Sequence, residues 1–479
     1  MTGELIRAVA ARGQVPDELC RKPVSELSPL LERREISSQQ LTAAVLERIA
    51  ALDRELHSYI MVCAETAMEQ ARAADLEIAS GRYRGPLHGV PLGVKDIVFT
   101  KGIRTTCGSK IMADFIPDED ATVVTRLRNS GAVLLGKHSM TEFAGIAYHP
   151  SIKPPVNPWN RERWPGASSS GSAVAVAAGL SFAAIGTDTG GSLRFPAAAC
   201  GVVGLKPTYG AVSRHGVFPL AESLDHAGPI TRSVQDACIV LHAIAGHDPL
   251  DPTTRRESPP DCSIAHQDLR TLRVGIDQAF CTDGINAEVA AALLQAASQL
   301  RDLGAAVIPV QVSGLEEATS VWGTLYCGDS AAAHEKTYAQ HAADYNPMFR
   351  AGLEAAFKVS ASDYARATAK RAAVTRAIDD LLTDTDVLLW PAMGQTARIF
   401  EELAPGGVMA PETADYLLRY TAPMSVSGHP ALVLCCGYDH DGMPIAMQLV
   451  ARHGREDLLF RAGMAYQQST DWHLRVPPV

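Results

Sequence analysis

Two distant segments of the chain share the same order of elements: a helix, then a glycine, then a strand. This order constrains the fold class more than any other feature of the sequence. In residues 120–136 an apolar helix face precedes Gly131, and AVLLG follows as a predicted strand. Residues 286–311 repeat the order, with Gly304 between an apolar-faced helix and the strand AAVIPVQV. Helices that alternate with strongly apolar strands are typical of α/β proteins whose sheet is largely buried.

The remaining regions fit a single domain over residues 1–479. Residues 1–80 predict a helical layer over the sheet, residues 85–240 its core, and residues 312–383 an alanine-rich helical region near a substrate pocket. Residues 246–270 are rich in proline and charge and predict a surface excursion. Because apolar strand signal resumes at LRVGI directly afterwards, the excursion joins two halves of one sheet.

Composition argues against several classes of partner. The net charge of −10 disfavours nucleic acids and anionic membranes, which require basic patches. The N-terminus has no apolar signal region, and the longest apolar run, from Ala173 to Ile185, is too short to span a bilayer. The ten cysteines form no CxxC pair and the histidines show no metal-ligand spacing. We expect a cytoplasmic protein without a metal that acts on a small molecule.

The segment from Pro165 to Pro207 is unusually rich in glycine and serine. SSS at residues 168–170 opens it, and Gly190-Gly191-Ser192 interrupts an apolar run further on. A glycine pair lets backbone amides approach a ligand, and a serine directly after it can combine a nucleophile with an oxyanion hole. The alternative is an ordinary loop that joins two elements.

A serine nucleophile needs a base, and Lys95 is the main candidate. The chain has no GxSxG elbow, no HExxH and no SxxK motif. Lys95 lies within the apolar run GVPLGVKDIV, and a lysine acts as a base only when burial or neighbouring charges depress its pKa towards neutrality. The local sequence alone favours the alternative, a lysine at a strand end whose ammonium reaches solvent.

Several ordered motifs together resemble the amidase signature family. They are PGASSSGSA, GTDTGGSLRFPAA, GLKPT, GVPLGVKD, KHSMTEFA, NPWN, TAPMSVSGHPAL and GMPIAMQLV, and they span roughly residues 20–470. The resemblance implies a single α/β/α domain in which helices flank both faces of a large, mixed, twisted sheet. It also implies hydrolysis of carboxamide C–N bonds, with release of ammonia or an amine and without a cofactor.

The resemblance also implies a Ser-Ser-Lys triad and an acyl-enzyme. Ser192 matches the nucleophile, Ser168 the bridging serine and Lys95 the base. The peptide bond between Ala167 and Ser168 matches the one that the family holds in cis. The implied oxyanion hole consists of the backbone amides of Thr189, Gly190, Gly191 and Ser192.

Neighbouring residues receive supporting roles. Ser169 is expected either to bond near Lys95 or to cap a helix, and Asp188 with Arg194 either to brace the loop or to contact substrate. Two positions depart from the family pattern, because Ala167 and Ser170 stand where glycines are usual. These departures touch the loop rather than the triad.

Selectivity must come from an acyl pocket outside the signature segment. Candidate lining residues are Met140, Tyr148, Trp322, Tyr326 and Met424, although each also suits a plain core position. Such a wall favours an apolar or aryl acyl group in a linear amide, with esters, ureas or carbamates as side substrates. The alternatives are the ammonia-generating subunit of a glutamine-dependent tRNA amidotransferase and a non-catalytic binding protein. The sequence leaves the oligomeric state open, a homodimer included.

Overall fold

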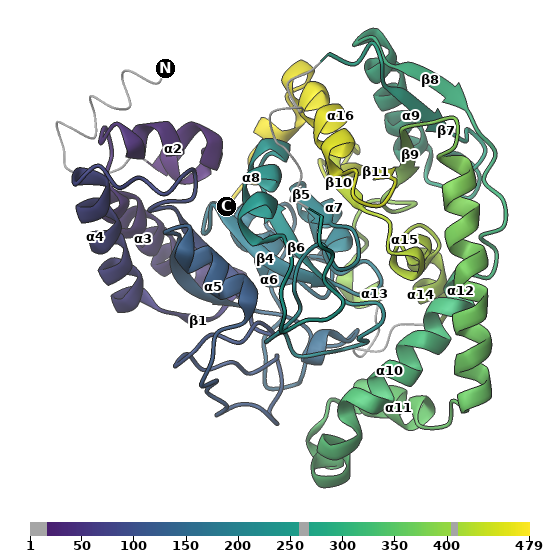
Figure 1. Ribbon diagram of the computed structural model, residues 1–479, viewed down its shortest axis with the longest axis horizontal. Helices are drawn as coiled ribbons and strands as arrows, with labels where there is room; N and C mark the ends of the chain where they lie inside the picture. The colour runs from purple at the N-terminus through teal and green to yellow at the C-terminus, as the bar shows by residue number, and fades with distance from the viewer. Residues whose placement is uncertain (1–16, 258–267, 404–410) are drawn as a thin grey trace.

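An eleven-stranded mixed sheet runs through the molecule, in the order β1-β3-β2-β4-β6-β5-β10-β11-β9-β7-β8. The structure is a computed structural model that describes residues 17–257, 268–403 and 411–479 (Figure 1). The strands are β1 Tyr59–Val62, β2 Pro91–Lys95, β3 Val133–His138, β4 Ala183–Asp188, β5 Val203–Lys206, β6 His226–Thr231, β7 Arg273–Ile276, β8 Ala306–Pro309, β9 Val387–Pro391, β10 Ala431–Tyr438 and β11 Pro444–Ala451.

The sheet has two parallel parts separated by antiparallel strands. Strand β2 pairs in parallel with β3 and with β4, and β7 pairs in parallel with β8 and with β9. Strands β6, β5, β10 and β11 join the two parts through antiparallel pairings. The expected α/β fold with one large mixed sheet is confirmed.

Helices flank the sheet, and the long helices α10 and α12 lie with the shorter α11 along one side of the molecule (Figure 1). Every residue of β4 and of β11 is buried, and successive side chains of a strand point to opposite faces, so both faces are covered there. The α-helices are α2 Val24–Glu32, α3 Ser38–Leu56, α4 Ala64–Ala79, α5 Thr122–Asn129, α6 Ser170–Ala177, α7 Arg194–Cys200, α8 Val234–Ile244, α9 Ala287–Asp302, α10 Ala318–His341, α11 Pro347–Ala356, α12 Ala361–Leu381, α13 Phe400–Leu403, α14 Pro411–Leu418, α15 Ala422–Ser427 and α16 Glu456–Ser469. Among the described residues, no helix combines the length and the apolar character that crossing a membrane requires.

Both predicted helix–glycine–strand units are present, as α5 with β3 and as α9 with β8. The N-terminal region differs from its prediction, because strand β1 interrupts the helical layer and pairs antiparallel with β3. The short segment YIMV is too brief to show strand periodicity, and the pairing with β3 decides its conformation. Residues 1–16 of the predicted layer lie outside the described residues.

The predicted surface excursion is anchored where it begins. Asp248 is buried, and its Oδ2 accepts hydrogen bonds from the hydroxyls of Thr122 and Ser213, both at 2.5 Å. These bonds satisfy a carboxylate that the local composition alone would place in solvent. The centre of the excursion, residues 258–267, lies outside the described residues.

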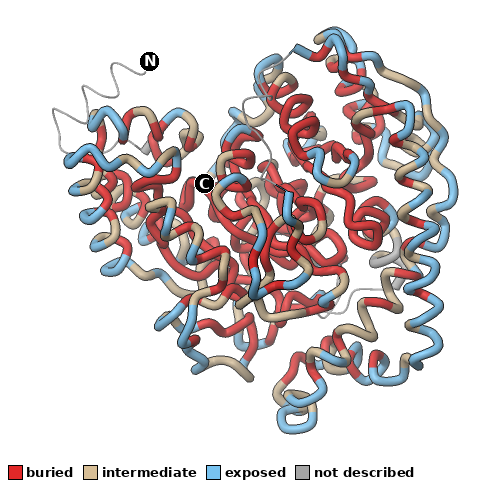
Figure 2. Tube along the Cα trace, in the orientation of Figure 1, coloured by how far each residue is buried: buried red, intermediate tan, exposed pale blue. Residues whose placement is uncertain are grey.

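The glycine- and serine-rich segment forms two short helices at the centre of the molecule. Every residue of α6 and of α7 is buried, in the red interior of Figure 2. A Cβ at Gly171 would lie 2.4 Å from the carbonyl oxygen of Ser58 and 2.5 Å from that of Ser139. Small residues therefore let α6 pack against the backbone on several sides, which accounts for the composition of the segment.

Candidate active site

The polar side chains at the centre of the site come from two neighbouring strands and from the turns before two short helices. Lys95 is the last residue of β2, and Thr187 lies near the end of β4. Because β2 and β4 are parallel, their carboxyl ends meet at one edge of the sheet. Ser168 precedes α6, and Ser192 lies between β4 and α7.

Lys95 is fully buried beside two hydroxyl groups. Its Nζ donates hydrogen bonds to Ser168 Oγ and to Thr187 Oγ1, both at 2.7 Å. Burial lowers the pKa of Lys95 to about 7, although the carboxylates of Asp188 and Asp225 oppose the shift. No ion pair to Lys95 is found among the described residues. Its side chain does not reach solvent, so the alternative of a solvent-exposed lysine at a strand end is wrong.

Ser168 and Ser192 both line one cavity at this edge of the sheet. Ser168 is fully buried and Ser192 is half-buried, so Ser192 is the hydroxyl that a bound molecule reaches more readily. The amide of Ser169 donates to the carbonyl of Ser192 at 3.2 Å and joins the two serine segments. In the described chain the two hydroxyls share no direct hydrogen bond, and catalytic contacts often shorten only when substrate binds.

Ser169 bonds near Lys95, as one of its two expected roles required, and does not cap a helix with its side chain. Its hydroxyl donates to the Thr187 carbonyl at 3.1 Å and accepts from the Thr187 amide at 3.3 Å. It forms no side-chain cap on α6 and no hydrogen bond with Lys95. Thr187, whose backbone it contacts, binds Lys95 through its own side chain. Local sequence could not reveal this contact. The peptide bond between Ala167 and Ser168 is cis.

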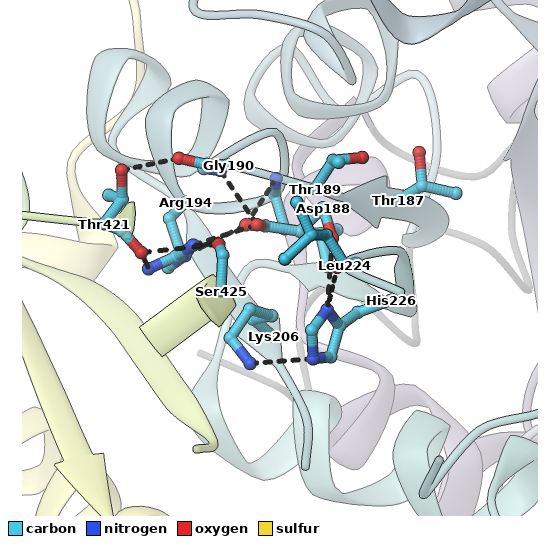
Figure 3. Close-up of polar contacts among 12 residues, drawn as sticks. Thr187, Asp188, Thr189, Gly190, Arg194, Lys206, Leu224, His226, Thr421 and Ser425 are labelled. Carbon is cyan, nitrogen blue, oxygen red and sulfur yellow. Dashed lines mark hydrogen bonds and ion pairs between the residues drawn. The ribbon is translucent and has the colours of Figure 1, made fainter. Parts of the chain in front are cut away.

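Asp188 and Arg194 form a buried ion pair that holds the loop between β4 and α7 (Figure 3). Arg194 Nε and Nη2 each donate to the Asp188 carboxylate at 2.9 Å. Burial alone would raise the pKa of Asp188, but the charge and hydrogen bonds of Arg194 outweigh it and keep that pKa well below its usual range. Arg194 also donates to the Thr421 carbonyl at 2.9 Å and to Ser425 Oγ at 2.8 Å. Every nitrogen of the Arg194 guanidinium is hydrogen-bonded, and the side chain is buried. Arg194 therefore braces the loop and does not line the cavity.

The amide of Gly191 differs from its expected role in an oxyanion hole. It donates to Asp188 Oδ1 at 2.8 Å and so belongs to the brace. The amides of Thr189, Gly190 and Ser192 have no hydrogen-bond partner within the described chain, and these three residues line the cavity. Trp322 Nε1 donates to the Thr189 carbonyl at 2.8 Å, which directs the Gly190 N–H of the same planar peptide unit the opposite way.

The cavity wall is mostly apolar, and the structure corrects three of the five predicted lining residues. Trp322 and Tyr326 line it and stack at a centroid distance of 4.9 Å. Met140 and Met424 are fully buried core residues instead. Tyr148 donates from its hydroxyl to Ser170 Oγ at 2.5 Å, which gives Ser170 a partner. The other lining residues are Ala144, Gly145, Ile146, Trp164, Ala167, Ser168, Thr189, Gly190, Ser192, Phe195, Leu220, Leu417 and Leu418.

Sequence reasoning missed Thr187 and Asp225. Asp225 Oδ1 accepts from the hydroxyl of Thr189 at 2.6 Å, and its Oδ2 accepts from two backbone amides. Burial raises the pKa of this carboxyl to about 6. Below Asp188 and Arg194 in Figure 3, Lys206 Nζ lies 3.1 Å from His226 Nε2. Alternation along β4 could have assigned Thr187 to the opposite face from Asp188, whereas no local signal marks Asp225.

Comparison with known proteins agrees with this geometry. Residues 40–460 match the model of the protein family described as Amidase. The chain belongs to the amidase family. Such a chain is, in coarse terms, a hydrolase that acts on amides.

Relatives of this amidase-family chain extend over almost its whole length. A putative amidase AmiD of Mycobacterium tuberculosis is 44% identical over 463 residues, which cover 97% of each chain. One subunit of the glutamyl-tRNA(Gln) amidotransferase of Moorella thermoacetica is 39% identical, and the match covers 96% of this chain and 99% of that subunit. The native peptide amidase of Stenotrophomonas maltophilia is 33% identical, with a TM-score of 0.84 over 97% of this chain and 99% of its own. The 6-aminohexanoate cyclic dimer hydrolase is 29% identical, with a TM-score of 0.87 over 96% and 99%.

Proposed function

We propose that this amidase-family chain hydrolyses linear carboxamides by itself, through an acyl-enzyme on Ser192. The observation that carries the proposal is the contact of 2.7 Å between Lys95 Nζ and Ser168 Oγ, beside a cavity whose wall also contains Ser192. With the pKa of Lys95 near 7, a large fraction of this lysine is neutral at physiological pH and can accept a proton. Ser168 passes protons between Lys95 and Ser192.

The proton balance of the reaction closes with these three side chains. Ser192 Oγ attacks the carbonyl carbon while its proton passes to Ser168, and the proton of Ser168 passes to Lys95. The amides of Thr189, Gly190 and Ser192 stabilise the negative oxygen. When the C–N bond breaks, the relay returns a proton to the leaving nitrogen, which departs as ammonia or an amine. Water then attacks the acyl-enzyme by the same route, and the carboxylic acid leaves.

The cavity favours an uncharged, apolar or aryl acyl group. Among the described residues, none with a charged side chain lines it, and the stacked rings of Trp322 and Tyr326 form one wall. The nearby guanidinium of Arg194 is bound to Asp188 and cannot receive a substrate carboxylate. Glutamine, which carries a free carboxylate and an ammonium group, fits this wall poorly.

Labelling and product analysis with matched variants test the proposal. We expect a fluorophosphonate probe to label the wild-type chain and the Ser170→Ala variant but not Ser192→Ala. Ser170 is a suitable control because it belongs to the same serine cluster and bonds to Tyr148 rather than to Lys95. The purified chain should release ammonia from aryl carboxamides faster than from glutamine. Absence of both label and ammonia would favour a non-catalytic binding protein.

The identity to amidotransferase subunits supports one second candidate, a glutaminase component of a tRNA amidotransferase complex. This candidate predicts no turnover of simple amides by the isolated chain. It further predicts that glutamine cleavage appears only after the other components of the complex are added. That pair of results would overturn the proposal of an enzyme that acts by itself, while labelling of Ser192 would remain.

A further inference from the structure

Two histidines and an aspartate from distant parts of the chain meet outside the catalytic cavity. Asp379 lies near the end of α12, His429 follows α15, and His453 follows β11. One ring nitrogen of each histidine and one carboxylate oxygen of Asp379 all lie within 4.8 Å of one another. These residues are 50 and 24 positions apart along the chain. Because metal-ligand motifs are recognised by short spacings, the sequence showed no sign of this cluster.

One residue, Ser427, orients both imidazole rings. His453 Nε2 lies 2.9 Å from the carbonyl of Ser427, which only accepts, so this nitrogen carries the proton and Nδ1 keeps a lone pair. His429 Nδ1 lies 2.9 Å from the hydroxyl of Ser427, and His429 Nε2 lies 3.2 Å from Asp379 Oδ1. A hydrogen bond from the second ring nitrogen to a backbone or side-chain oxygen is the usual support of a metal-binding histidine.

Burial and access also suit a bound ion. His429 is fully buried, whereas the side chain of Asp379 is 42% exposed and lines a surface cavity along α12. This cavity shares no lining residue with the catalytic one.

We propose that Asp379, His429 and His453 bind a divalent transition-metal ion, with Zn²⁺ the best match. Two imidazoles and one carboxylate are common zinc ligands, and the exposed side of Asp379 leaves room for water at a fourth position. Calcium and magnesium are poor matches because they prefer sites made entirely of oxygen atoms. The ion would tie α12 to the segment that directly follows α15, the helix whose Ser425 accepts a hydrogen bond from Arg194.

The competing arrangement needs no metal. In it, Ser427 Oγ donates to His429 Nδ1, and His429 Nε2 donates to Asp379 Oδ1. Both arrangements satisfy the same distances, so a metal titration separates them. Arg376 and Asp380 offer a matched control, because they form an exposed ion pair at 3.0 Å on the same helix.

The experiment titrates chelator-treated full-length protein with Zn²⁺ against a chromophoric chelator. We expect one equivalent to bind to the wild-type chain and to Asp380→Asn, and at least about 10-fold weaker binding to Asp379→Asn and His453→Gln. Both substituted residues are partly exposed, so these variants should fold even if His429→Asn does not. Zn²⁺ should raise the midpoint of thermal unfolding in the first two proteins and not in the second two, and Ca²⁺ should have no effect.

Either of two results would overturn the proposal. One is a wild-type chain that binds no Zn²⁺ in this competition, which would leave the plain hydrogen-bonded arrangement. The other is equal affinity in wild type and Asp379→Asn, which would place the ion elsewhere, such as at the partly exposed Cys63 or Cys327. Ser192→Ala should bind Zn²⁺ like wild type, so this test is independent of the proposed catalytic function.

Discussion

Two buried lysines on neighbouring strands show how partners decide what a buried amine can do. Lys95 on β2 contacts only the hydroxyls of Ser168 and Thr187, according to the hydrogen bonds of the described residues. Lys137 on β3 is equally buried, but its Nζ lies 3.8 Å from a carboxylate oxygen of Asp96. Lys137 also donates to the Val98 carbonyl and to two threonine hydroxyls.

The two lysines are close in the sheet yet face opposite sides of it. Lys95 is in register with His138, the residue after Lys137, so the two amines point to different faces. Burial lowers the pKa of both, and carboxylates oppose the shift in each case. For Lys95 they are the Asp188 and Asp225 groups, which form no ion pair with it, and for Lys137 it is Asp96, which lies 3.8 Å from its Nζ. An amine that contacts only hydroxyls can lose its proton at neutral pH, whereas a carboxylate beside a buried amine favours the ammonium form.

The largest effect is expected from Lys95→Met, which removes the proposed base and keeps the volume. We expect kcat for amide hydrolysis to fall by about 10³-fold, within the range that a positioned base contributes. Stability at pH 7 should not fall, because a lysine whose pKa drops from 10.5 to about 7 on burial destabilises the folded state by about 5 kcal/mol when it is protonated. Steady-state kinetics and thermal unfolding measure the two quantities. An active Lys95→Met enzyme would remove Lys95 from the mechanism.

Lys137→Met should produce the opposite pattern. It leaves the Asp96 carboxylate buried without a cation, and breaking a buried pair in this way costs about 3–5 kcal/mol of unfolding free energy. The kcat of the protein that remains folded should change little. The double variant Lys137→Met/Asp96→Asn should recover much of the stability in denaturant titrations. A stable but inactive Lys137→Met would contradict the structural role of this lysine.

The difference between the two lysines was only partly predictable from sequence. Motif order placed Lys95, Ser168 and Ser192 in one site, and the structure joins Lys95 to Ser168. The local surroundings of Lys95 are as apolar as those of Lys137, which lies in AVLLGKH. Because the decisive partners, Thr187 and Asp96, depend on strand register and loop packing, local sequence does not distinguish a base from a structural cation.

The same limit applies to the cavity. The alternation of helices and strands predicted the sheet, since periodicity is a local property. Lining residues depend on where side chains from separate elements meet. Met424 therefore lies in the core although its motif is close to the site, while Leu417 and Leu418 of α14 line the cavity without any local signal.

The pH profile sharpens the comparison further. Lys95 must be neutral to accept a proton, and its pKa is about 7, so kcat/KM should rise as pH increases through about 7 and level off above it. Below that point the rate should fall about 10-fold per pH unit. The rate of fluorophosphonate labelling should show the same rise with pH, because it also depends on Ser192. A profile that is flat between about pH 6 and 8, or highest below about pH 6, would contradict a lysine base.

The smallest effect is expected from Thr187→Val, which removes one of the two acceptors of Lys95 Nζ and keeps the shape of the side chain. The ammonium form loses more than the neutral amine when an acceptor disappears, so the rising limb of kcat/KM should move to lower pH. We expect kcat to fall by about 10-fold or less, with KM unchanged, because the amine is less firmly positioned.

The matched control is Thr100→Val, which removes an acceptor at 3.2 Å from Lys137 instead. If both variants moved the limb equally, the distinction between the two lysines would fail. A shift confined to Thr187→Val would assign the titration to Lys95, because Thr100 contacts the amine on the other face of the sheet.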